Sequence, residues 1–256
     1  MHLHVITIFP DMFKALTEEG VVARLLKNDN KQFSIWNPRD FTKDVHRTVD
    51  DRSYGGGPGM VFMAEPLVAA IAAAKQQSPG ARVIYMSPAG QVFNQSCAKQ
   101  MSEDLVNGVD YIFLCGRYEG IDQRVIDHHV DELWSLGDFV LSGGEIAAMA
   151  MIDAVVRHIP GCLGNKDSFL EDSFVEGLLD YGHYTRPENF AGNTVPAVLL
   201  SGNHALIKRW RQQQALGITW LNRPDLLDNK SLTSEQTALL DEFKRERQHG
   251  REKQDE

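Results

Sequence analysis

Gly-Arg-Tyr-Glu-Gly-Ile-Asp, residues 116–122, follows an apolar run that extends from Tyr111 to Cys115. A second segment, residues 135–145, reads Ser-Leu-Gly-Asp-Phe-Val-Leu-Ser-Gly-Gly-Glu and precedes an apolar helical pattern at residues 146–156. Polar glycine turns at the ends of strands are where α/β proteins usually bind ligands. Two such turns close together predict a ligand that is held by backbone atoms rather than by side chains.

Around these turns the sequence alternates strand-like and helix-like segments. Apolar runs predict strands at residues 3–9, 33–36, 82–86 and 111–115. Amphipathic or alanine-rich segments predict helices at residues 11–26, 65–77, 94–106 and 146–156, the third capped by Asn94. Residues 37–60 should form a long loop. This alternation is typical of an α/β fold, a mostly parallel sheet with helices on both faces.

The pattern changes after residue 160. We expect an α/β domain at residues 1–160, a flexible linker at 161–176 and a smaller, mainly helical domain at 177–256. In the last part, an amphipathic helix should cover residues 204–216. Thr233-Ser-Glu-Gln236 is a capping-box pattern that opens another helix, reaching about residue 243. The charged or polar tail, residues 244–256, is predicted to be frayed or disordered.

Composition excludes several classes of protein. The chain has 256 residues and a net charge of −9, and no apolar run approaches the roughly 20 residues needed to span a membrane. The N-terminus does not read as a signal peptide. Three widely spaced cysteines predict neither a disulfide framework nor a zinc site, which favours the reduced cytoplasm.

The acidic net charge argues against nucleic acid as a partner, but the distribution of charged residues along the chain does not. Residues 189–224 contain no Asp or Glu, whereas Lys208, Arg209, Arg211 and Arg223 lie within them. Lys208-Arg209-Trp210-Arg211 places cations around an aromatic ring on a predicted helix. The pattern fits a face that contacts phosphates, and it also fits a surface that covers a buried Trp210.

Other motifs are open to plain structural interpretations. The run Gly55-Gly-Gly-Pro-Gly59 could bind phosphate but lacks the lysine of a nucleotide-binding P-loop. His128-His129 matches no metal motif and is better explained by a solvated helix. Glu119 and Arg157 each suit a helix terminus by charge. Asp172 precedes Ser173-x-x-Glu176, a capping-box pattern that predicts a further helix start.

Longer strings nevertheless carry a resemblance to a known family. They are Ile8-Phe-Pro-Asp-Met-Phe13, Tyr54-Gly-Gly-Gly-Pro-Gly-Met60, Cys115-Gly-Arg-Tyr-Glu-Gly-Ile-Asp122, Gly137-Asp-Phe-Val-Leu-Ser-Gly-Gly-Glu145, Glu171-Asp-Ser-Phe174, Tyr184-Thr-Arg-Pro187 and Leu200-Ser-Gly-Asn-His204. In this order they closely resemble the bacterial tRNA (guanine-N1)-methyltransferases of the SPOUT superfamily. The resemblance covers roughly residues 1–243.

The resemblance implies a fold and an assembly that the residues themselves do not reveal. It implies a SPOUT-type parallel sheet with a deep trefoil knot, followed by the helical domain. It also implies an obligate homodimer in which each active site is built from both subunits.

The implied cofactor is S-adenosylmethionine, bound in bent form among the loops of the knot. Carried over by position, its contacts would be Tyr85, Met86, Ser87, Pro88, Gly116, Leu136, Gly137, Asp138, Phe139, Val140, Leu141, Gly143 and Gly144. The family more often has Ile and Tyr where this chain has Leu136 and Phe139. The change leaves backbone contacts intact but puts in doubt any role that needs a hydroxyl at Phe139.

The implied reaction is methyl transfer to N1 of the guanine at tRNA position 37, next to the anticodon. Guanine N1 carries a proton, so a general base is needed, which by resemblance is Asp172. Arg157 would stabilise the charge that develops on O6. Glu119 would position the guanine or a magnesium ion. Because a free Asp has a pKa of about 3.9, proton loss should accompany methyl transfer, and a linker that carries the base suits a lid that orders when tRNA binds.

The helical domain would then bind tRNA, with Lys208, Arg209 and Arg211 as candidate phosphate contacts. Three alternative functions fit the sequence less well. A SPOUT enzyme acting on a ribose 2′-oxygen is disfavoured by the string at residues 171–174, and a non-catalytic RNA-binding protein by the joint presence of Glu119, Arg157 and Asp172. A phosphate-binding NTPase lacks its P-loop lysine.

Overall fold

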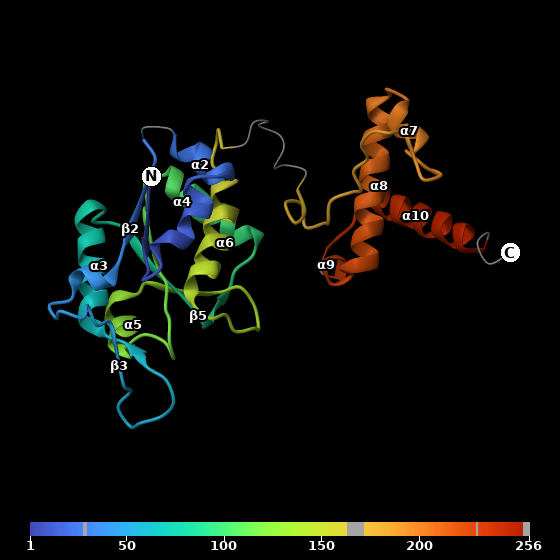
Figure 1. Ribbon diagram of the computed structural model, residues 1–256. Helices are drawn as coiled ribbons and strands as arrows, with labels where there is room; N and C mark the ends of the chain where they lie inside the picture. The colour runs from blue at the N-terminus through green and yellow to red at the C-terminus, as the bar shows by residue number, and fades with distance from the viewer. Residues whose placement is uncertain (28–29, 163–171, 229, 253–256) are drawn as a thin grey trace. The chain divides into compact units, whose positions relative to one another are not determined.

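A computed structural model of the chain describes residues 1–27, 30–162, 172–228 and 230–252 (Figure 1). Backbone contacts divide the chain into two compact units, Met1–Lys166 and Asp167–Glu256. Each unit is described by itself below. Most of the predicted linker, residues 163–171, lies outside the described residues.

The first unit is built on a parallel sheet of five strands in the order β2-β1-β6-β5-β7. The strands are β1 (His2–Ile6), β2 (Gln32–Trp36), β5 (Arg82–Val92), β6 (Tyr111–Leu114) and β7 (Glu132–Ser135). The prediction of an α/β fold with a parallel sheet is confirmed. Strand β7 was not predicted, because four residues are too few to establish a period.

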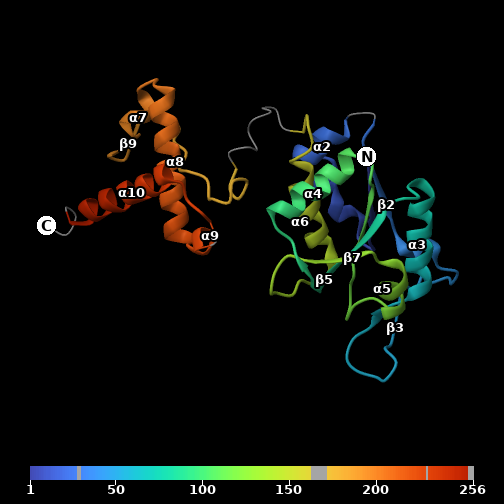
Figure 2. The same cartoon turned by 180° about the vertical axis from the view of Figure 1, so that it is seen from behind.

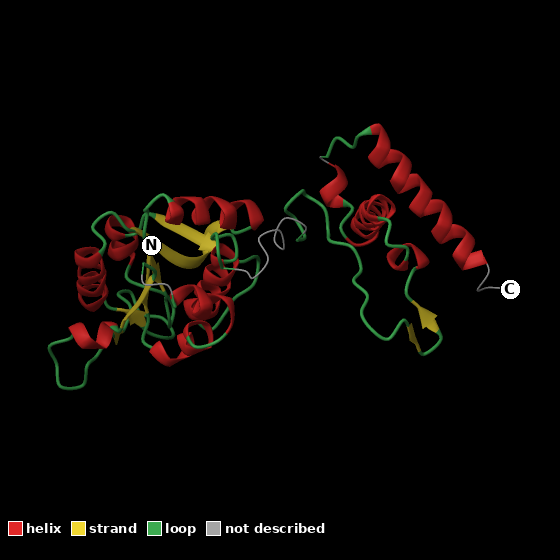
Figure 3. Cartoon of the chain, turned by 90° about the horizontal axis from the view of Figure 1, so that it is seen from above, coloured by secondary structure: helices red, strands yellow, loops and turns green. Residues whose placement is uncertain are grey.

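Helices cover both faces of this sheet (Figures 1, 2 and 3). One face buries side chains of α2 (Gly20–Leu26), α4 (Gln95–Val106) and α6 (Gly144–Val156). The other face packs against α3 (Ala64–Gln77) and α5 (Gln123–His129). The Asn94 side chain accepts a hydrogen bond from the Cys97 amide at 3.1 Å, so this predicted N-cap is confirmed.

Three boundaries differ from the prediction. The first strand ends at Ile6 rather than Phe9, where the Thr7 hydroxyl accepts the Phe9 amide at 2.9 Å and turns the chain. The helix predicted at residues 11–26 is broken into η1 (Pro10–Phe13), α1 (Lys14–Thr17) and α2. Gly20, at the break, has a φ of +75°, a conformation that favours glycine.

The predicted loop at residues 37–60 contains a short helix, η2 (Pro38–Phe41), and a strand, β3 (Asp50–Asp51), that pairs with β4 (Val61–Phe62). β5 continues beyond its predicted end through an irregularity between Met86 and Gln91. A β-carbon on Gly90 would lie 2.4 Å from the backbone of β7. The glycine therefore lets two neighbouring backbones meet where β5 bends.

The second unit contains a two-stranded ribbon and helices. The elements are β8 (Asn189–Phe190), β9 (Asn193–Thr194), α7 (Ala197–Leu200), α8 (His204–Asn222), α9 (Asp225–Asp228) and α10 (Ser234–Glu252). The capping box at α10 is confirmed, because Thr233 and Gln236 exchange backbone-to-side-chain hydrogen bonds of 3.0 and 3.1 Å. α8 and α10 pack closely at Gly217, where a β-carbon would lie 2.4 Å from the Phe243 ring.

Two predictions for this unit are wrong. The tail predicted to be frayed or disordered from residue 244 is helical through Glu252, because its Lys, Arg, Glu and Gln residues are good helix formers that extend an anchored helix. No helix starts at Ser173, whose hydroxyl instead accepts the Asp180 amide at 2.9 Å within a turn. Among the described residues, no helix is both long and apolar enough to cross a membrane.

A buried polar chain ties the first strands together. The Trp36 indole donates to Nδ1 of His4 at 3.1 Å, which places the His4 proton on Nε2. Nε2 then donates to the Ser78 hydroxyl at 3.0 Å, and Ser78 donates to Asp110 at 2.6 Å. His2 stacks on His4 with ring centroids 3.7 Å apart. Burial, with a smaller effect of His2, lowers the pKa of His4 to about 4.

We expect His4 to make the first unit sensitive to acid. Its pKa falls from 6.5 to about 4 on folding, so between these values the unfolded chain binds a proton that the folded protein does not. Stability therefore falls as pH falls, by up to roughly 3 kcal/mol. The midpoint of thermal unfolding of a His4→Gln variant should decline less than that of the wild type between pH 7 and pH 4.

A His204→Gln variant serves as the control, because His204 is exposed at the start of α8. It should keep the pH dependence of the wild type. Equal slopes for His4→Gln and the wild type would contradict the assignment.

Candidate functional site

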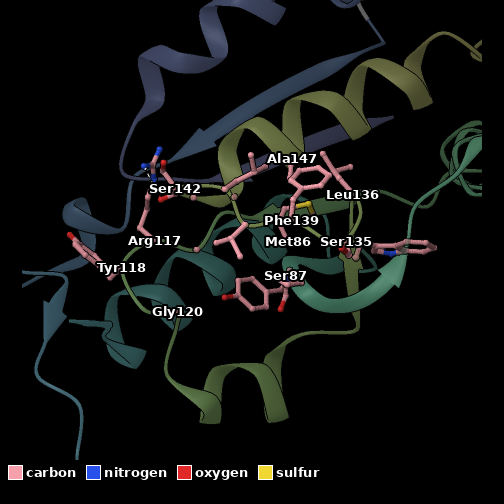
Figure 4. Close-up of a pocket in the computed structure, with 18 of the residues that line it drawn as sticks. Met86, Ser87, Arg117, Tyr118, Gly120, Ser135, Leu136, Phe139, Ser142 and Ala147 are labelled. Atoms are coloured by element: carbon pink, nitrogen blue, oxygen red, sulfur yellow. Dashed lines mark hydrogen bonds between the residues drawn. The ribbon is translucent and has the colours of Figure 1, made fainter. Parts of the chain in front are cut away.

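A cavity of about 250 Å³ opens at the carboxyl ends of β6 and β7, beside the irregularity in the middle of β5 (Figure 4). Its walls are residues 85–88 of β5, the turn that follows β6, the loop that follows β7, and the first turn of α6. This is the edge of a parallel sheet at which ligands bind in α/β proteins. In Figure 4, Arg117 and Tyr118 lie at one end of the cavity, and Ser135 and Leu136 lie at the other.

The residues predicted to contact a cofactor surround this cavity, with the exception of Asp138. Those that line it are Tyr85, Met86, Ser87, Pro88, Gly116, Leu136, Gly137, Phe139, Val140, Leu141, Gly143 and Gly144. Asp138 is exposed in the same loop. Glu119, predicted as a catalytic residue, also lines the cavity.

Further lining residues were not predicted. They are Arg117, Tyr118, Gly120, Trp134, Ser135, Ser142 and Ala147. Most lie inside the two glycine-rich segments, residues 116–122 and 135–145. Membership of these segments is therefore the signal by which they could have been predicted. Trp134 lies in β7. Because this strand was not predicted from the sequence, Trp134 could not be predicted as a lining residue.

Glycines bring the walls of the cavity into backbone contact. The Gly144 amide donates to the Gly116 carbonyl at 2.9 Å. A β-carbon on Gly144 would lie 2.9 Å from Cα of Cys115, and one on Gly116 would lie 2.8 Å from the Tyr85 ring. Larger residues would push these walls apart. The cavity therefore presents backbone atoms and apolar side chains to a ligand, as the glycine turns predict.

Two titratable groups behind the wall, Cys115 and Tyr85, are held neutral. Cys115 is fully buried, and desolvation, assisted by Glu145, raises the pKa of its thiol well above the usual value. Burial also raises the pKa of the Tyr85 phenol. Neither group supplies a nucleophile near neutral pH. Chemistry at this cavity therefore depends on groups at its rim or on groups brought to it.

A buried ion pair joins the segments around the cavity. Glu145 has an exposure of 0%, and its carboxylate accepts from Nε of Arg117 at 2.8 Å and from the Thr7 hydroxyl at 2.8 Å. Arg117 also donates to the Ser142 carbonyl at 3.2 Å. Gly143 lies beneath the guanidinium, where a β-carbon would be 2.2 Å from Nε.

The glycine-rich segment before β4 packs beside the turn that carries Glu119. The Glu119 amide donates to the Met60 carbonyl at 2.9 Å. A β-carbon on Gly59 would lie 2.4 Å from Oε1 of Glu119, so the glycine leaves room for this carboxylate. Apart from its two chain neighbours, no atom of the described residues lies within 4 Å of the corresponding position on Gly56.

Tyr118, next to Glu119, adopts a φ of +62°, which is uncommon for a residue other than glycine. Its ring meets Phe62 edge to face at 5.6 Å. Burial and a hydrogen bond to Asp50 raise its pKa. The strained turn is thus supported from β3 and β4, the strands within and after the predicted loop.

Arg157 lies away from this cavity. It follows the last residue of α6, whereas Gly144 and Ala147 of the first turns line the cavity. A helix of 13 residues is about 20 Å long. The Arg157 side chain therefore cannot reach the cavity of its own chain. The structure does not bring Arg157 together with Glu119, the predicted catalytic residue that lines the cavity.

Asp172 belongs to the second unit, where it lines an open groove of about 930 Å³. The predicted RNA contacts Lys208, Arg209 and Arg211 line the same groove. Arg209 forms an ion pair of 2.5 Å with Glu242 of α10, and the Arg211 guanidinium lies 4.8 Å from the centre of the Tyr181 ring. The groove is a mixed surface, because Glu176, Asp180 and Glu235 line it together with Asp172 and the cations.

No group of three or more His, Cys, Asp or Glu residues suited to a metal ion occurs in the described part of the chain. His128 and His129 end the short helix α5, and His128 is exposed.

Comparisons with known proteins place the chain beside one enzyme family. Residues 1–229 match the family described as tRNA (Guanine-1)-methyltransferase TrmD. A tRNA (guanine-N(1)-)-methyltransferase of Photorhabdus laumondii is 58% identical over 249 residues, which cover 96% of this chain and 97% of that protein. The protein of the same name from Escherichia fergusonii is 55% identical over 256 residues, covering 100% of this chain and 99% of the relative.

Proposed function

The chain belongs to the tRNA (guanine-1)-methyltransferase family, whose reaction is the methylation of N1 of a guanine in tRNA. We propose which of its residues carry out this reaction. The match of residues 1–229 to the family carries the reaction class. The cavity at the carboxyl edge of the sheet supplies a place for a methyl donor. We take the target to be the guanine at position 37 and the site of action to be the cytoplasm.

S-adenosylmethionine is the cofactor that a methyltransferase of this family implies, and the lining of the cavity fits it. The adenine ring is flat and apolar on its faces, which suits Leu136, Leu141 and Phe139. Its polar edge needs hydrogen-bond partners at fixed positions, which backbone amides and carbonyls of the glycine turns can provide. When bound, the cofactor supplies an electrophilic methyl group.

The residues of the chain must then make guanine N1 nucleophilic. Asp172 takes the N1 proton as general base. As N1 loses its proton, negative charge spreads to O6, and the guanidinium of Arg157 stabilises it. Glu119, at the rim of the cavity, positions the guanine or a magnesium ion.

The position of Asp172 supports coupling between tRNA binding and proton removal. This carboxylate lines the same groove of the second unit as Lys208, Arg209 and Arg211. tRNA phosphates that bind these cations would bring the second unit, and the base that it carries, to the guanine. Lys208 is exposed and is the simplest phosphate contact of the three, because Arg209 and Arg211 already contact Glu242 and Tyr181.

Two further features belong to this proposal, a homodimer and a trefoil knot. The dimer is supported by the position of Arg157, which can reach a cavity only in another copy. Exposed apolar side chains beside the cavity, Phe139, Val140 and Ile146, also favour a covered surface. The knot rests on the family resemblance, together with the close packing of the loops that follow β6 and β7.

The decisive experiment is a methyl-transfer assay with labelled S-adenosylmethionine. The substrates are tRNA transcripts that carry guanine or adenine at position 37, and the products are mapped by mass spectrometry. We expect N1-methylguanine on the guanine transcript alone. An Asp172→Asn variant should lose at least about a hundredfold in rate, as expected of a general base, and still bind the cofactor. Methylation of a ribose oxygen would overturn the assignment.

Sharing of the site between subunits is tested by mixing two inactive variants. Glu119→Gln damages the cavity of its own chain, whereas Arg157→Ala damages the cavity of its partner. Co-expression in equal amounts gives hybrid dimers with one intact site, so about a quarter of wild-type activity should return. If Arg157 acts within its own chain, no combination has an intact site and no activity returns.

The role of Glu119 is tested through Gly59. Gly59 and Gly56 have φ values of +78° and +77°, so alanine at either position introduces the same backbone strain, about 1–2 kcal/mol. Only at residue 59 would the new β-carbon displace the Glu119 carboxylate. We expect equal losses in the midpoint of thermal unfolding and a selective fall in turnover for Gly59→Ala. Equal turnover of the two variants would argue against a role for Glu119.

A further inference from the structure

Arg117 lies in the first of the two glycine turns, and the mechanism gives its side chain no part. It lines the cavity between Gly116 and Glu119, yet only 20% of its side chain is exposed. We propose that Arg117, held by the buried carboxylate of Glu145, is a positioning residue that fixes the two loops of the cofactor cavity at their binding distance. This inference rests on the proposed function, because it assigns Arg117 a part in binding S-adenosylmethionine.

The first argument is that the guanidinium is already engaged by the protein. Its Nε donates to Glu145 at 2.8 Å, its Nη1 to the Ser142 carbonyl at 3.2 Å, and its Nη2 contacts the Met12 sulfur at 3.7 Å. One face of the group lies 4.4 Å from the centre of the Phe9 ring. Three of its five N–H donors thus point to the protein, so the group acts through the segments that it joins.

The second argument concerns which segments are joined. Arg117 belongs to the turn after β6, and Ser142 ends the loop after β7; these are two walls of the cavity. Besides the hydrogen bond between Gly144 and Gly116, the Arg117–Ser142 contact holds one wall to the other. Gly143 lies under the guanidinium, and because its φ is 175°, its need for glycine comes from space and not from backbone conformation.

The third argument is that Glu145 leaves Arg117 no freedom. The Glu145 carboxylate is fully buried, and its second oxygen, Oε1, accepts a hydrogen bond from the Thr7 hydroxyl at 2.8 Å. The pair fixes the plane of the guanidinium, and with it the direction of the N–H that reaches Ser142. Lysine has a single charged nitrogen in place of a planar fork, so it cannot satisfy Glu145 and Ser142 with the same geometry.

The test uses the full-length protein with Arg117→Lys, Glu145→Gln and the double variant. The dissociation constant of S-adenosylmethionine is measured by calorimetry without tRNA, alongside the thermal midpoint and the KM for each substrate. We expect Arg117→Lys to weaken cofactor binding about tenfold and to raise the KM for the cofactor, with the KM for tRNA within about twofold of the wild type. Glu145→Gln should act in the same direction, and the double variant should add little.

Arg124→Lys is the matched control, because Arg124 also pairs with a carboxylate, that of Asp122 at 2.7 Å, but is exposed. It should bind the cofactor like the wild type. A lower thermal midpoint with unchanged cofactor affinity in Arg117→Lys and Glu145→Gln would show a purely structural pair and overturn the inference. An effect confined to the KM for tRNA would overturn it as well. Failure of the wild type itself to bind S-adenosylmethionine would instead refute the proposed function.

Discussion

The ion pair between Glu145 and Arg117 is the constraint on which the first unit depends. A carboxylate with no exposure to water is tolerated only when it is paired and hydrogen-bonded, and removing one partner of such a pair typically costs about 3–5 kcal/mol. To satisfy Glu145, the end of β1, the turn after β6 and the start of α6 must meet at one point. The carboxyl edge of the sheet is therefore organised by the same contact that closes the core behind it.

Much of this architecture could be predicted because it follows from local rules. Asn94 and Thr233 cap their helices through their own side chains, and the glycine turns mark the ends of strands. The errors arose where distant residues decide. β7 is a strand because β5 lies beside it, and α10 continues through its charged residues because its first half is anchored on α8. Neither effect leaves a periodic pattern in the local sequence.

In the candidate site, too, local features could be predicted and contacts between distant segments could not. The glycine turns could be recognised as walls, and the family resemblance named most residues of the cavity. The sequence did not reveal that Gly59 makes room for Glu119 or that Gly143 makes room for Arg117, since both are contacts between segments far apart in the chain. Three candidate catalytic residues occupy three places: Glu119 at the cavity, Arg157 beyond the far end of α6, and Asp172 in the second unit. In the proposed mechanism, such dispersal would make the reaction conditional on assembly and so guard a reactive methyl donor against water and chance acceptors.

The backbone lining of the cavity has a consequence for drug resistance. A protein usually escapes an inhibitor by exchanging a side chain that touches it. Here Gly116 and Gly144 present main-chain atoms, and any β-carbon added at either would collide with Tyr85 or with the backbone of Cys115, just after β6. A compound that gained its affinity from these two glycines would leave few single-codon routes of escape, because the changes that exclude the drug would also distort the natural binding site.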